Sequence, residues 1–544
     1  MADKVGNKFL KGAAVLALAG ILMKVLGAVF RIPLTNMIGT DGMSYYGVAY
    51  SIYGALVVLA TAGIPVAISR LVSENIAINR YRNAHRVFRV ALVMMTGIGL
   101  ITFLICFFGA EMIASLVKNP EAALAVRATA PALLLVPMFS TFRGYFNGRQ
   151  NMNPTAISEL TEQLVRCGVG LYLAYRFYKV NLIYAAAGAS FGASAGALGG
   201  LAIIFLIFLM NRRVFQTKIE RGDQEIESKE SIAKQILIIA IPIIIGCEIM
   251  PIMTLVDTSI VMRVLQNTGW TYAEAKDLYG LFSGFCNALI AFPQMFTQAV
   301  AVSLVPAVSA QFKLRNMQGV RVTIVLGKRT TMIMAFPCAF GIFVLAEPIL
   351  KLLYFAQPES CHEAAPILMV MAISIIFLAD MQTSTSVLQS VGKQMVPVRN
   401  LAIGCVLKVF ATYILVGIHS VNVMGAAIGT MIAYVVAMFL NAYAVKKYTG
   451  AGGAFERTYI RPMIAAAIMA ACAFGIYRAL MMAPVWNGHS EVGASGLCTI
   501  IAILCAMMIY AVLIFLVKVI TVEELEQIPI GRKLARIVRK FIRN

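Results

Sequence analysis

The sequence predicts an all-α, polytopic membrane protein with about fourteen transmembrane helices, and three observations lead to this prediction. Of the 544 residues, 60% are hydrophobic and 13% are charged, and the mean hydropathy is +0.82. Apolar runs long enough to cross a bilayer recur along the chain. Each run is predicted as a helix because an isolated helix satisfies its own backbone hydrogen bonds in lipid.

The predicted spans form two sets of six and a final pair. The ranges are 10–34, 45–69, 87–109, 128–147, 157–178 and 183–210, then 235–264, 279–310, 323–346, 363–391, 396–417 and 423–445, then 460–482 and 494–519. They predict an N-terminal six-helix lobe (1–210), a cytoplasmic linker (211–234), a C-terminal six-helix lobe (235–447), two additional transmembrane helices (448–520) and a basic amphipathic cytoplasmic tail (521–544).

The two sets of six repeat each other. AEMIASLV at Ala110–Val117 resembles AEPILKLL at Ala346–Leu353, and each is followed closely by a polar residue, proline and glutamate, at 119–121 and 357–359. Both sets contain an even number of spans, so both begin on the same side of the membrane. We therefore expect parallel repeats with a substrate cavity between the two lobes.

Charge follows the predicted topology. A net charge of +21 would suggest a nucleic-acid partner in a soluble protein. Here the cations occupy alternate short loops, which predicts cytoplasmic termini and no nucleic-acid partner. The first apolar stretch is predicted to be a retained span because it is longer than a signal-peptide core. In the tail, Gly531–Asn544 alternates basic residues with one apolar stripe. It predicts an interfacial helix on anionic lipids, with a nucleic-acid arm as the alternative.

Lys24 and Arg31 are the most informative residues. Both lie in the first span, and their spacing of seven places them on one helical face. A cation at bilayer depth costs about 3 kcal/mol or more unless it meets water or a partner. We expect the pair to line a cavity that receives an anionic substrate. The alternative is that Arg31 snorkels to the outer interface while Lys24 pairs with a buried carboxylate.

Further polar residues interrupt the spans. Glu248, Asp257 and Arg263 in the seventh span are candidates for an ion site or a cavity charge, and Gln294 and Gln298 share a helical face that could bind sugar hydroxyls or a diphosphate. Structural ion pairs and helix–helix hydrogen bonds are the alternatives. In the fifth span, the spacing of Glu162 and Arg166 predicts an intrahelical ion pair. Asp380 in the tenth span and Lys408 in the eleventh complete the set of charged residues considered inside the predicted spans.

No catalytic motif is present in the sequence, and we predict that the protein is not an enzyme. It contains no P-loop, no G-x-S-x-G and no H-E-x-x-H, and its ten cysteines include no C-x-x-C pair. The cysteines are expected to be packing residues, with Cys361 in an outer loop, and no metal or organic cofactor is expected. Transport without a nucleotide motif would draw on an ion gradient, with Na⁺ or H⁺ as the coupling ion, or on another gradient.

The first span, KVLGAVFRIPL followed by IG at 38–39, resembles the signature of the lipid II flippases of the stage V sporulation protein B and MurJ type. These are polysaccharide biosynthesis proteins of the MOP exporter superfamily. Phe292-Pro293 and the VSLVPAVS segment at 302–309 resemble the eighth span of the same group. Thr61 stands where the family carries an acidic residue, so the chain looks more like the sporulation-type branch.

The resemblance implies a transmembrane flippase of cell wall synthesis. It would translocate an undecaprenyl-diphosphate-linked peptidoglycan precursor, lipid II, or a related lipid-linked oligosaccharide across the bacterial cytoplasmic membrane by alternating access. Lys24 and Arg31 would meet the diphosphate, and Asp257 is the candidate for a Na⁺ ligand. One alternative is a cation-coupled multidrug exporter of the same superfamily, whose cavity should be acidic. Another is a scaffold in an envelope or sporulation complex.

Overall fold

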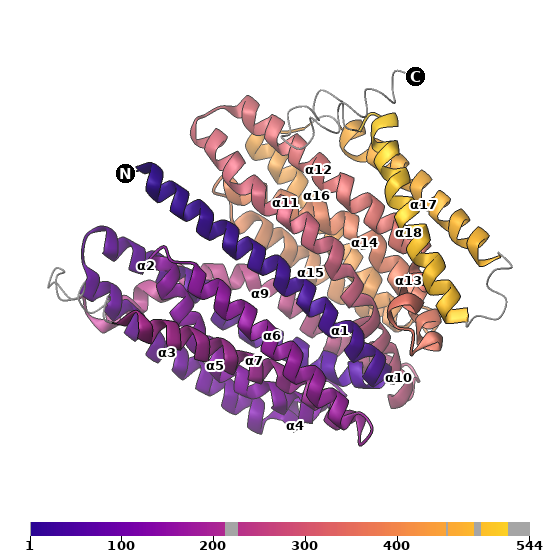
Figure 1. Cartoon of the computed structure of the whole chain (residues 1–544), viewed down its shortest axis with the longest axis horizontal. Helices are drawn as coiled ribbons and strands as arrows, with labels where there is room; N and C mark the ends of the chain where they lie inside the picture. The colour runs from indigo at the N-terminus through magenta and orange to yellow at the C-terminus, as the bar shows by residue number, and fades with distance from the viewer. Residues whose placement is uncertain (1, 213–226, 453–454, 483–490, 520–544) are drawn as a thin grey trace. The chain divides into compact units, whose positions relative to one another are not determined.

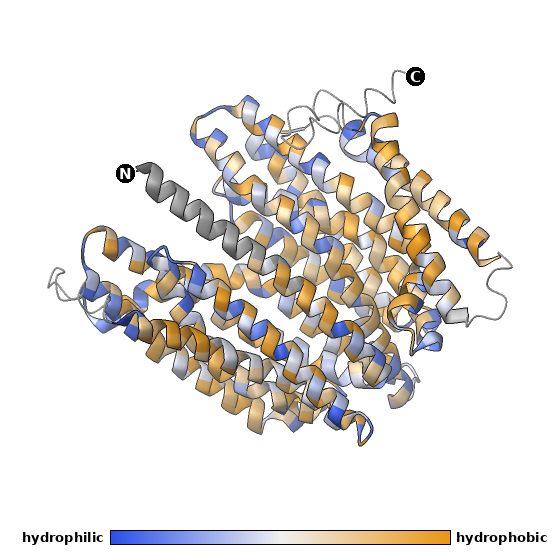
Figure 2. Ribbon diagram, in the orientation of Figure 1, coloured by the Kyte–Doolittle hydropathy of each residue, from blue (hydrophilic) through white to orange (hydrophobic). Residues whose placement is uncertain are grey.

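The structure, a computed structural model, describes residues 2–212, 227–452, 455–482 and 491–519, with side chains for all of these except 2–18, 21, 24, 302, 491 and 492. The described residues are helices joined by short connections and contain no strand (Figure 1). The all-α prediction is therefore confirmed. Hydrophobic residues dominate the long helices, and hydrophilic residues gather at the connections (Figure 2).

The chain divides by its internal contacts into two units, which are described separately. Unit 1 comprises 1–288 and 412–426. Its helices are α1 (Ala2–Thr61), α2 (Gly63–Ala77), α3 (Tyr81–Phe108), α4 (Ala110–Leu116), η1 (Pro120–Ala122), α5 (Ala123–Gly148), α6 (Asn153–Phe177), α7 (Leu182–Met210), α9 (Lys229–Asn267), α10 (Tyr272–Gly280) and η2 (Leu281–Cys286).

Unit 2 comprises 289–411 and 427–544. It contains most of α11 (Asn287–Lys313), α12 (Met317–Val344), α13 (Ala346–Leu353), α14 (Pro358–Ser390), most of α15 (Met395–Val416), most of α16 (Met424–Thr449), η3 (Glu456–Ile460), α17 (Arg461–Met481) and α18 (Glu491–Leu516). The predicted tail lies outside the described residues, as do 213–226 of the predicted linker. The boundaries of the two repeated lobes stay a prediction.

Every predicted span coincides with a described helix. Among the described residues, eleven helices are long and apolar enough to cross a membrane, or twelve when the bent pair α12 and α13 counts as one span. The other two of the fourteen predicted spans are not counted separately there. Val25–Ala77 counts once although two spans were predicted there, and α6 is excluded because it carries Glu159, Glu162 and Arg166.

The connection predicted between the first two spans is helical. Helix α1 runs through it with Pro33 inside and is kinked at Gly39, whose φ is 60° and ψ is −163°. A residue with a Cβ rarely adopts this conformation, so glycine permits the kink. The kink separates the segment that carries Arg31 from the segment that carries Tyr45.

The predicted repeat reappears as local structure in each unit by itself. The short helices α4 and α13 have the resembling sequences. Asn119 after α4 has φ −136° and ψ 73°, and Gln357 after α13 has φ −133° and ψ 57°. Each of these residues lies outside the helical region and precedes a proline that begins the next helix, in keeping with the rule that a residue before proline disfavours the α conformation.

Small residues on α7 position the charged helix α6. A Cβ at Gly196 would lie 2.6 Å from the carbonyl oxygen of Glu162, and a Cβ at Gly192 would lie 2.7 Å from that of Arg166. Glycine therefore allows the two backbones to approach closely, as in other membrane helix pairs. This close approach fixes the position of α6 along α7, and so the position of Glu162 and Arg166 within unit 1.

Candidate functional site

Arg31 lies half-buried on α1, two residues before Pro33. Its guanidinium Nη2 donates a hydrogen bond to the carbonyl oxygen of Ser283, and its Nε is buried without a partner among the described residues. No carboxylate of the described chain lies within ion-pair distance of it. The guanidinium thus has spare hydrogen-bond donors and no carboxylate partner among the described residues, which is the condition for binding an anion.

The acceptor of Arg31 belongs to a π-helical segment. Residues Leu281–Cys286 form η2, a wider turn than an α-helix, and such turns often mark functional sites. Glycines bring this segment against α1: a Cβ at Gly284 would lie 2.7 Å from Cβ of Met43, and a Cβ at Gly47 would lie 2.8 Å from Oγ of Ser283. Close packing on α1 therefore holds the Ser283 carbonyl where Arg31 reaches it.

A buried hydroxyl chain connects three helices of unit 1. Thr258 on α9 donates to Oγ of Ser51 on α1 at 2.9 Å, and its Oγ1 lies 2.8 Å from the hydroxyl of Tyr279 on α10. Asp257, which is 5% exposed, and Arg31 both interact electrostatically with Tyr279. The fold therefore brings two predicted site residues, Arg31 and Asp257, to one polar region.

The other predicted site residues of α9 lie in different settings. Glu248 is 8% exposed, and its Oε1 has no hydrogen-bond partner among the described residues. Arg263 is exposed and donates from Nη2 to the carbonyl oxygen of Leu116, the last residue of α4, at 3.2 Å. Glu248 and Asp257 thus supply buried carboxylates, whereas Arg263 connects two helix ends. Their predicted roles stay predictions.

Three further predicted site residues either belong to unit 2 or have a side chain outside the described residues. The side chain of Lys24 is outside the described residues. Gln294 and Gln298 lie on the part of α11 that belongs to unit 2, where Gln294 is half-buried and Gln298 is exposed. Between them, the buried Thr297 donates to Oε1 of Gln382 at 3.3 Å. One face of this helix therefore already carries side-chain hydrogen bonding.

The ion pair predicted within α6 is wrong. Glu162 accepts from Nη2 of Arg143 on α5 at 2.9 Å, and Glu159 lies 4.0 Å from the same guanidinium. Arg166 instead stacks over the ring of Tyr50 on α1, with its guanidinium carbon 4.6 Å from the centroid. Arg143 outcompetes Arg166 because it approaches Glu162 from a facing helix. Arg166 is consequently a second half-buried cation beside α1.

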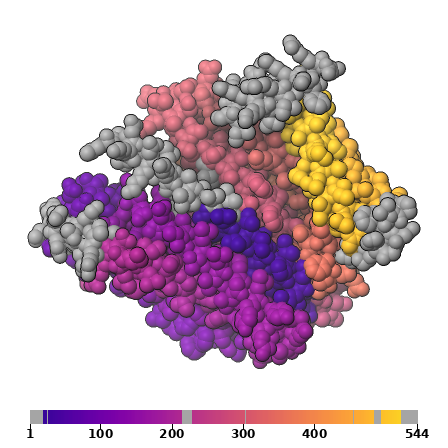
Figure 3. Space-filling view, in the orientation of Figure 1, coloured from indigo at the N-terminus to yellow at the C-terminus, as the bar shows by residue number. Residues whose placement is uncertain are grey.

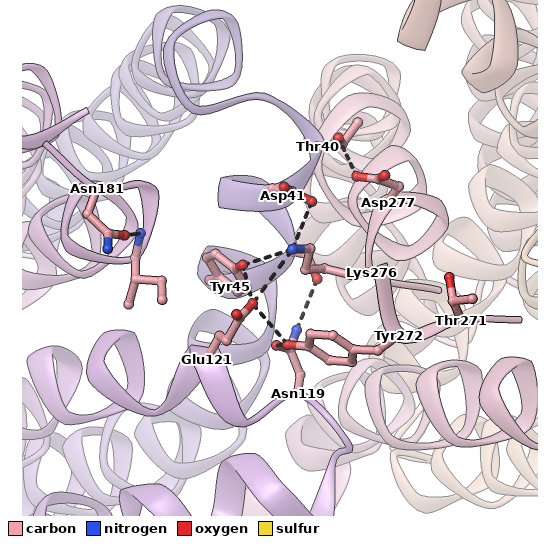
Figure 4. A network of polar contacts seen from close by, with 12 residues as sticks. Thr40, Asp41, Tyr45, Asn119, Glu121, Asn181, Thr271, Tyr272, Lys276 and Asp277 are labelled. Carbon is pink, nitrogen blue, oxygen red and sulfur yellow. Dashed lines mark hydrogen bonds and ion pairs between the residues drawn. The ribbon is translucent and has the colours of Figure 1, made fainter. Parts of the chain in front are cut away.

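A second polar network, missed by the sequence analysis, surrounds Lys276 on α10 (Figure 4). Its Nζ lies 3.2 Å from Oδ1 of Asp41, 3.0 Å from the hydroxyl of Tyr45 and 3.6 Å from Oε2 of Glu121. Tyr45 also donates to Glu121. These contacts tie α10 to the far side of the α1 kink and to η1, and we call the group around Lys276 the outer latch.

Two further side chains complete the outer latch. The hydroxyl of Tyr272 lies 2.8 Å from Oδ1 of Asn119 and 3.2 Å from Oε2 of Glu121, and Asn119 donates to Oγ of Ser44 at 3.0 Å. The signal in the sequence was a lysine among the acidic residues of the predicted outer loops. Its partners come from three separate segments, so spacing alone could not pair them.

Other chemistry is limited in the described part of the chain. No three His, Cys, Asp or Glu side chains of the described residues gather closely enough to hold a metal ion. Cys361, expected in an outer loop, is instead buried in α14, where its thiol lies 3.6 Å from the carbonyl oxygen of Tyr354. The expectation failed because α14 begins at Pro358, earlier than the predicted span. The geometry favours binding of an anion.

One apolar face of α1 remains exposed, on the side of the helix away from Arg31. Leu22, Val25 and Val29 are 43%, 37% and 57% exposed. The space-filling view shows part of α1, in indigo, at the surface beside the magenta helices of unit 1 (Figure 3).

The chain is 26% identical to stage V sporulation protein B of Bacillus subtilis (strain 168), over 97% of this chain and 99% of that protein. It is 25% identical to the lipid II flippase MurJ of the same organism, over 82% and 84% respectively. These relatives are membrane transport and sporulation proteins, and none of them is named as an enzyme.

Solved structures share the fold. A lipid II flippase MurJ in an inward closed conformation has a TM-score of 0.63 and 14% identity, covering 92% of this chain and 98% of that chain. An inward-facing multidrug resistance MATE family transporter of the MOP superfamily has a TM-score of 0.68 and 13% identity, covering 79% and 95%.

Family models give the assignment. The MatE model matches residues 282–414, and the model of the polysaccharide biosynthesis proteins matches residues 9–312, more than half of the chain. The protein is a multi-pass membrane protein, and it belongs to the polysaccharide biosynthesis protein family.

Proposed function

We propose that the protein is a flippase that moves a lipid-linked, diphosphate-bearing sugar across the bacterial cytoplasmic membrane by alternating access. Lipid II, the undecaprenyl-diphosphate-linked peptidoglycan precursor, is the proposed substrate, because the relatives include a lipid II flippase. Both termini are proposed to lie on the cytoplasmic side, since the cation-rich loops alternate in that sense.

The half-buried, uncompensated guanidinium of Arg31 carries the proposal. It has a backbone carbonyl as its partner instead of a carboxylate, and its Nε is still available. A cation exporter needs an acidic site, whereas this site presents positive charge. A diphosphate would supply the charge-assisted hydrogen bonds that Arg31 lacks. Lys24 is proposed as the second diphosphate ligand, seven residues earlier on α1.

The remaining candidates have distinct roles in this proposal. Gln294 and Gln298 are proposed to bind sugar hydroxyls or phosphate oxygens, while the polyprenyl chain stays in lipid. Release on the outer side requires the outer latch around Lys276 to open. Coupling to Na⁺ or H⁺ is proposed at Asp257 or Glu248, both buried carboxylates of α9. Arg263, which lies at the end of the same helix, is proposed to adjust the charge at that end.

Complementation tests the proposal. Arg31→Ala, Arg31→Lys and Lys24→Ala are expressed in a strain depleted of its lipid II flippase, and lipid II exposed at the cell surface is measured. We expect Arg31→Ala and Lys24→Ala to abolish surface exposure at unchanged membrane abundance, with partial rescue by Arg31→Lys. Arg176→Ala, an exposed arginine of α6, is the matched control and should complement fully. Full complementation by both alanine variants would refute the proposal.

A multidrug exporter is the second candidate, favoured by the match of residues 282–414 to the MatE model. Its substrates would be cations, for which the positive site at Arg31 is unfavourable. Resistance to cationic dyes on expression, unaffected by Arg31→Ala, would favour this candidate over the flippase. We expect no such resistance.

A further inference from the structure

Unit 2 contains a cavity where α11 ends, α12 begins and α14 ends. Its volume is about 730 Å³, and its lining includes Phe312, Met317 and Val391 as apolar residues, with Lys313 and Arg315 as cations. A cavity of this size suits a small organic molecule or a lipid headgroup with the upper part of its chains. A lining that combines apolar residues with two cations matches an anionic amphiphile.

Among the described residues, the two cations of this cavity form no ion pair. The sequence has no Asp or Glu between Asp277 and Glu347, and none between Asp380 and Glu456. Lys313 and Arg315 accordingly have no carboxylate partner among the described residues. The start of α12 adds the positive end of a 28-residue helix, capped by Asn316, whose side chain accepts from the amide of Gly319 at 2.9 Å.

The backbone of Arg315 has an unusual conformation. Its φ of 57° lies in the left-handed region, two residues after the end of α11. A helix ending of this kind normally carries glycine or asparagine, which adopt the conformation with less strain. Ser309 and Ser390 line the same cavity, and Ser309 donates to the carbonyl oxygen of Ser390 at 3.1 Å, which joins α11 to α14. The cavity wall is therefore held together by its own hydrogen bond.

We propose that this cavity binds an anionic phospholipid, with the phosphate on Lys313 and Arg315 and the upper acyl chains against Phe312 and Met317. The site lies at the end of unit 2 that the charge pattern predicts to be cytoplasmic, so the inner leaflet supplies the lipid. The proposal is independent of the transported substrate, because the site contains none of the residues assigned to transport.

Native mass spectrometry of the detergent-purified full chain tests the site. Phosphatidylglycerol, phosphatidylcholine and free glycerol phosphate are offered separately. The test variant is Lys313→Gln with Arg315→Asn, because asparagine tolerates the left-handed backbone and keeps the helix ending. The matched control is Lys118→Asn, since Lys118 has a φ of 60° at the end of α4, away from the cavity.

We expect retention of phosphatidylglycerol to fall at least fivefold in the double variant and to be unchanged in Lys118→Asn. Phosphatidylcholine and free glycerol phosphate should be retained poorly by all three proteins. Equal retention of phosphatidylglycerol by the wild type and the double variant would overturn the proposal. Equal binding of free glycerol phosphate would assign the site to a soluble phosphate instead. Lipid binding only after deletion of 521–544 would assign the cavity to the chain's own tail, whose first residues include Glu523, Glu524 and Glu526.

Discussion

Lys276 Nζ lies 3.2 Å from Oδ1 of Asp41, and this contact joins α10 to the part of α1 beyond its kink. The lysine side chain is 11% exposed and the aspartate side chain 36% exposed. The pair is therefore less screened by solvent than a surface ion pair, and Glu121 at 3.6 Å adds a second negative charge. Without the lysine, acidic residues would face one another across the contact.

Lys276→Gln should weaken the outer latch. Loss of the cation leaves Asp41 and Glu121 without their shared partner, so we expect the free energy of unfolding to fall by about 1–3 kcal/mol. The melting temperature of the purified protein measures this loss. Lys179→Gln, an exposed lysine of the same unit, should have no effect. An unchanged melting temperature in Lys276→Gln would show that the latch contributes no stability.

Gly280→Ala should separate α10 from α1. A Cβ at Gly280 would overlap the carbonyl oxygen of Thr40, and a backbone atom cannot move aside as a side chain can. We expect a loss of about 1–3 kcal/mol, the usual cost of overpacking a tight contact. Gly97→Ala on α3 is the matched control, because no atom lies within 4 Å of its added Cβ. Equal melting temperatures for the two alanine variants would contradict the close approach.

Arg143→Met should destabilise unit 1 because it leaves Glu162 without its partner. The two side chains are 12% and 20% exposed, so a loss of about 3 kcal/mol is expected for breaking the pair. The double variant Arg143→Met with Glu162→Met should recover much of that loss, since no unpaired charge remains. Thermal unfolding of the four proteins in a double-mutant cycle measures the coupling. A coupling energy near zero would instead favour a pair between Glu162 and Arg166 within α6.

Arg166→Met should behave differently from Arg143→Met. Arg166 stacks on Tyr50 and has no carboxylate partner among the described residues, so only a cation–π contact of about 0.5–2 kcal/mol is removed. The melting temperature should therefore fall less than in Arg143→Met. A larger fall would indicate that Arg166 is the main partner of Glu162 in the membrane.

The helices were predictable from the sequence because each apolar run is long and bounded by charged loops. The contacts between side chains of different helices were not predictable in this way. Spacing along one helix suggested Arg166 for Glu162, but the facing helix α5 brings Arg143 closer. Lys276 was missed because its partners lie in α1 and η1, and only the folded chain brings them together. Arg31 was predicted to line a cavity that receives an anionic substrate. The structure gives it the carbonyl oxygen of Ser283 as a partner, and the cavity stays a prediction.

Tyr459→Phe should destabilise unit 2 through a buried aspartate. The hydroxyl of Tyr459 donates to Oδ1 of Asp380 at 2.9 Å, and Nζ of Lys328 lies 3.1 Å from the same oxygen. Asp380 has a side chain that is 2% exposed, so each lost partner leaves part of a buried charge unsatisfied.

We expect the free energy of unfolding to fall by about 1.5–3 kcal/mol in Tyr459→Phe, the range for hydrogen bonds to charged groups. Because η3 leads directly into α17, amide hydrogen exchange should rise in both elements before it rises in α14. Tyr443→Phe on α16, where the tyrosine is 69% exposed, is the matched control and should leave exchange and melting temperature unchanged. Exchange that rises equally in α14 and α17 would mean that Asp380 depends on Lys328 alone, and that the Tyr459 hydroxyl does not anchor α17.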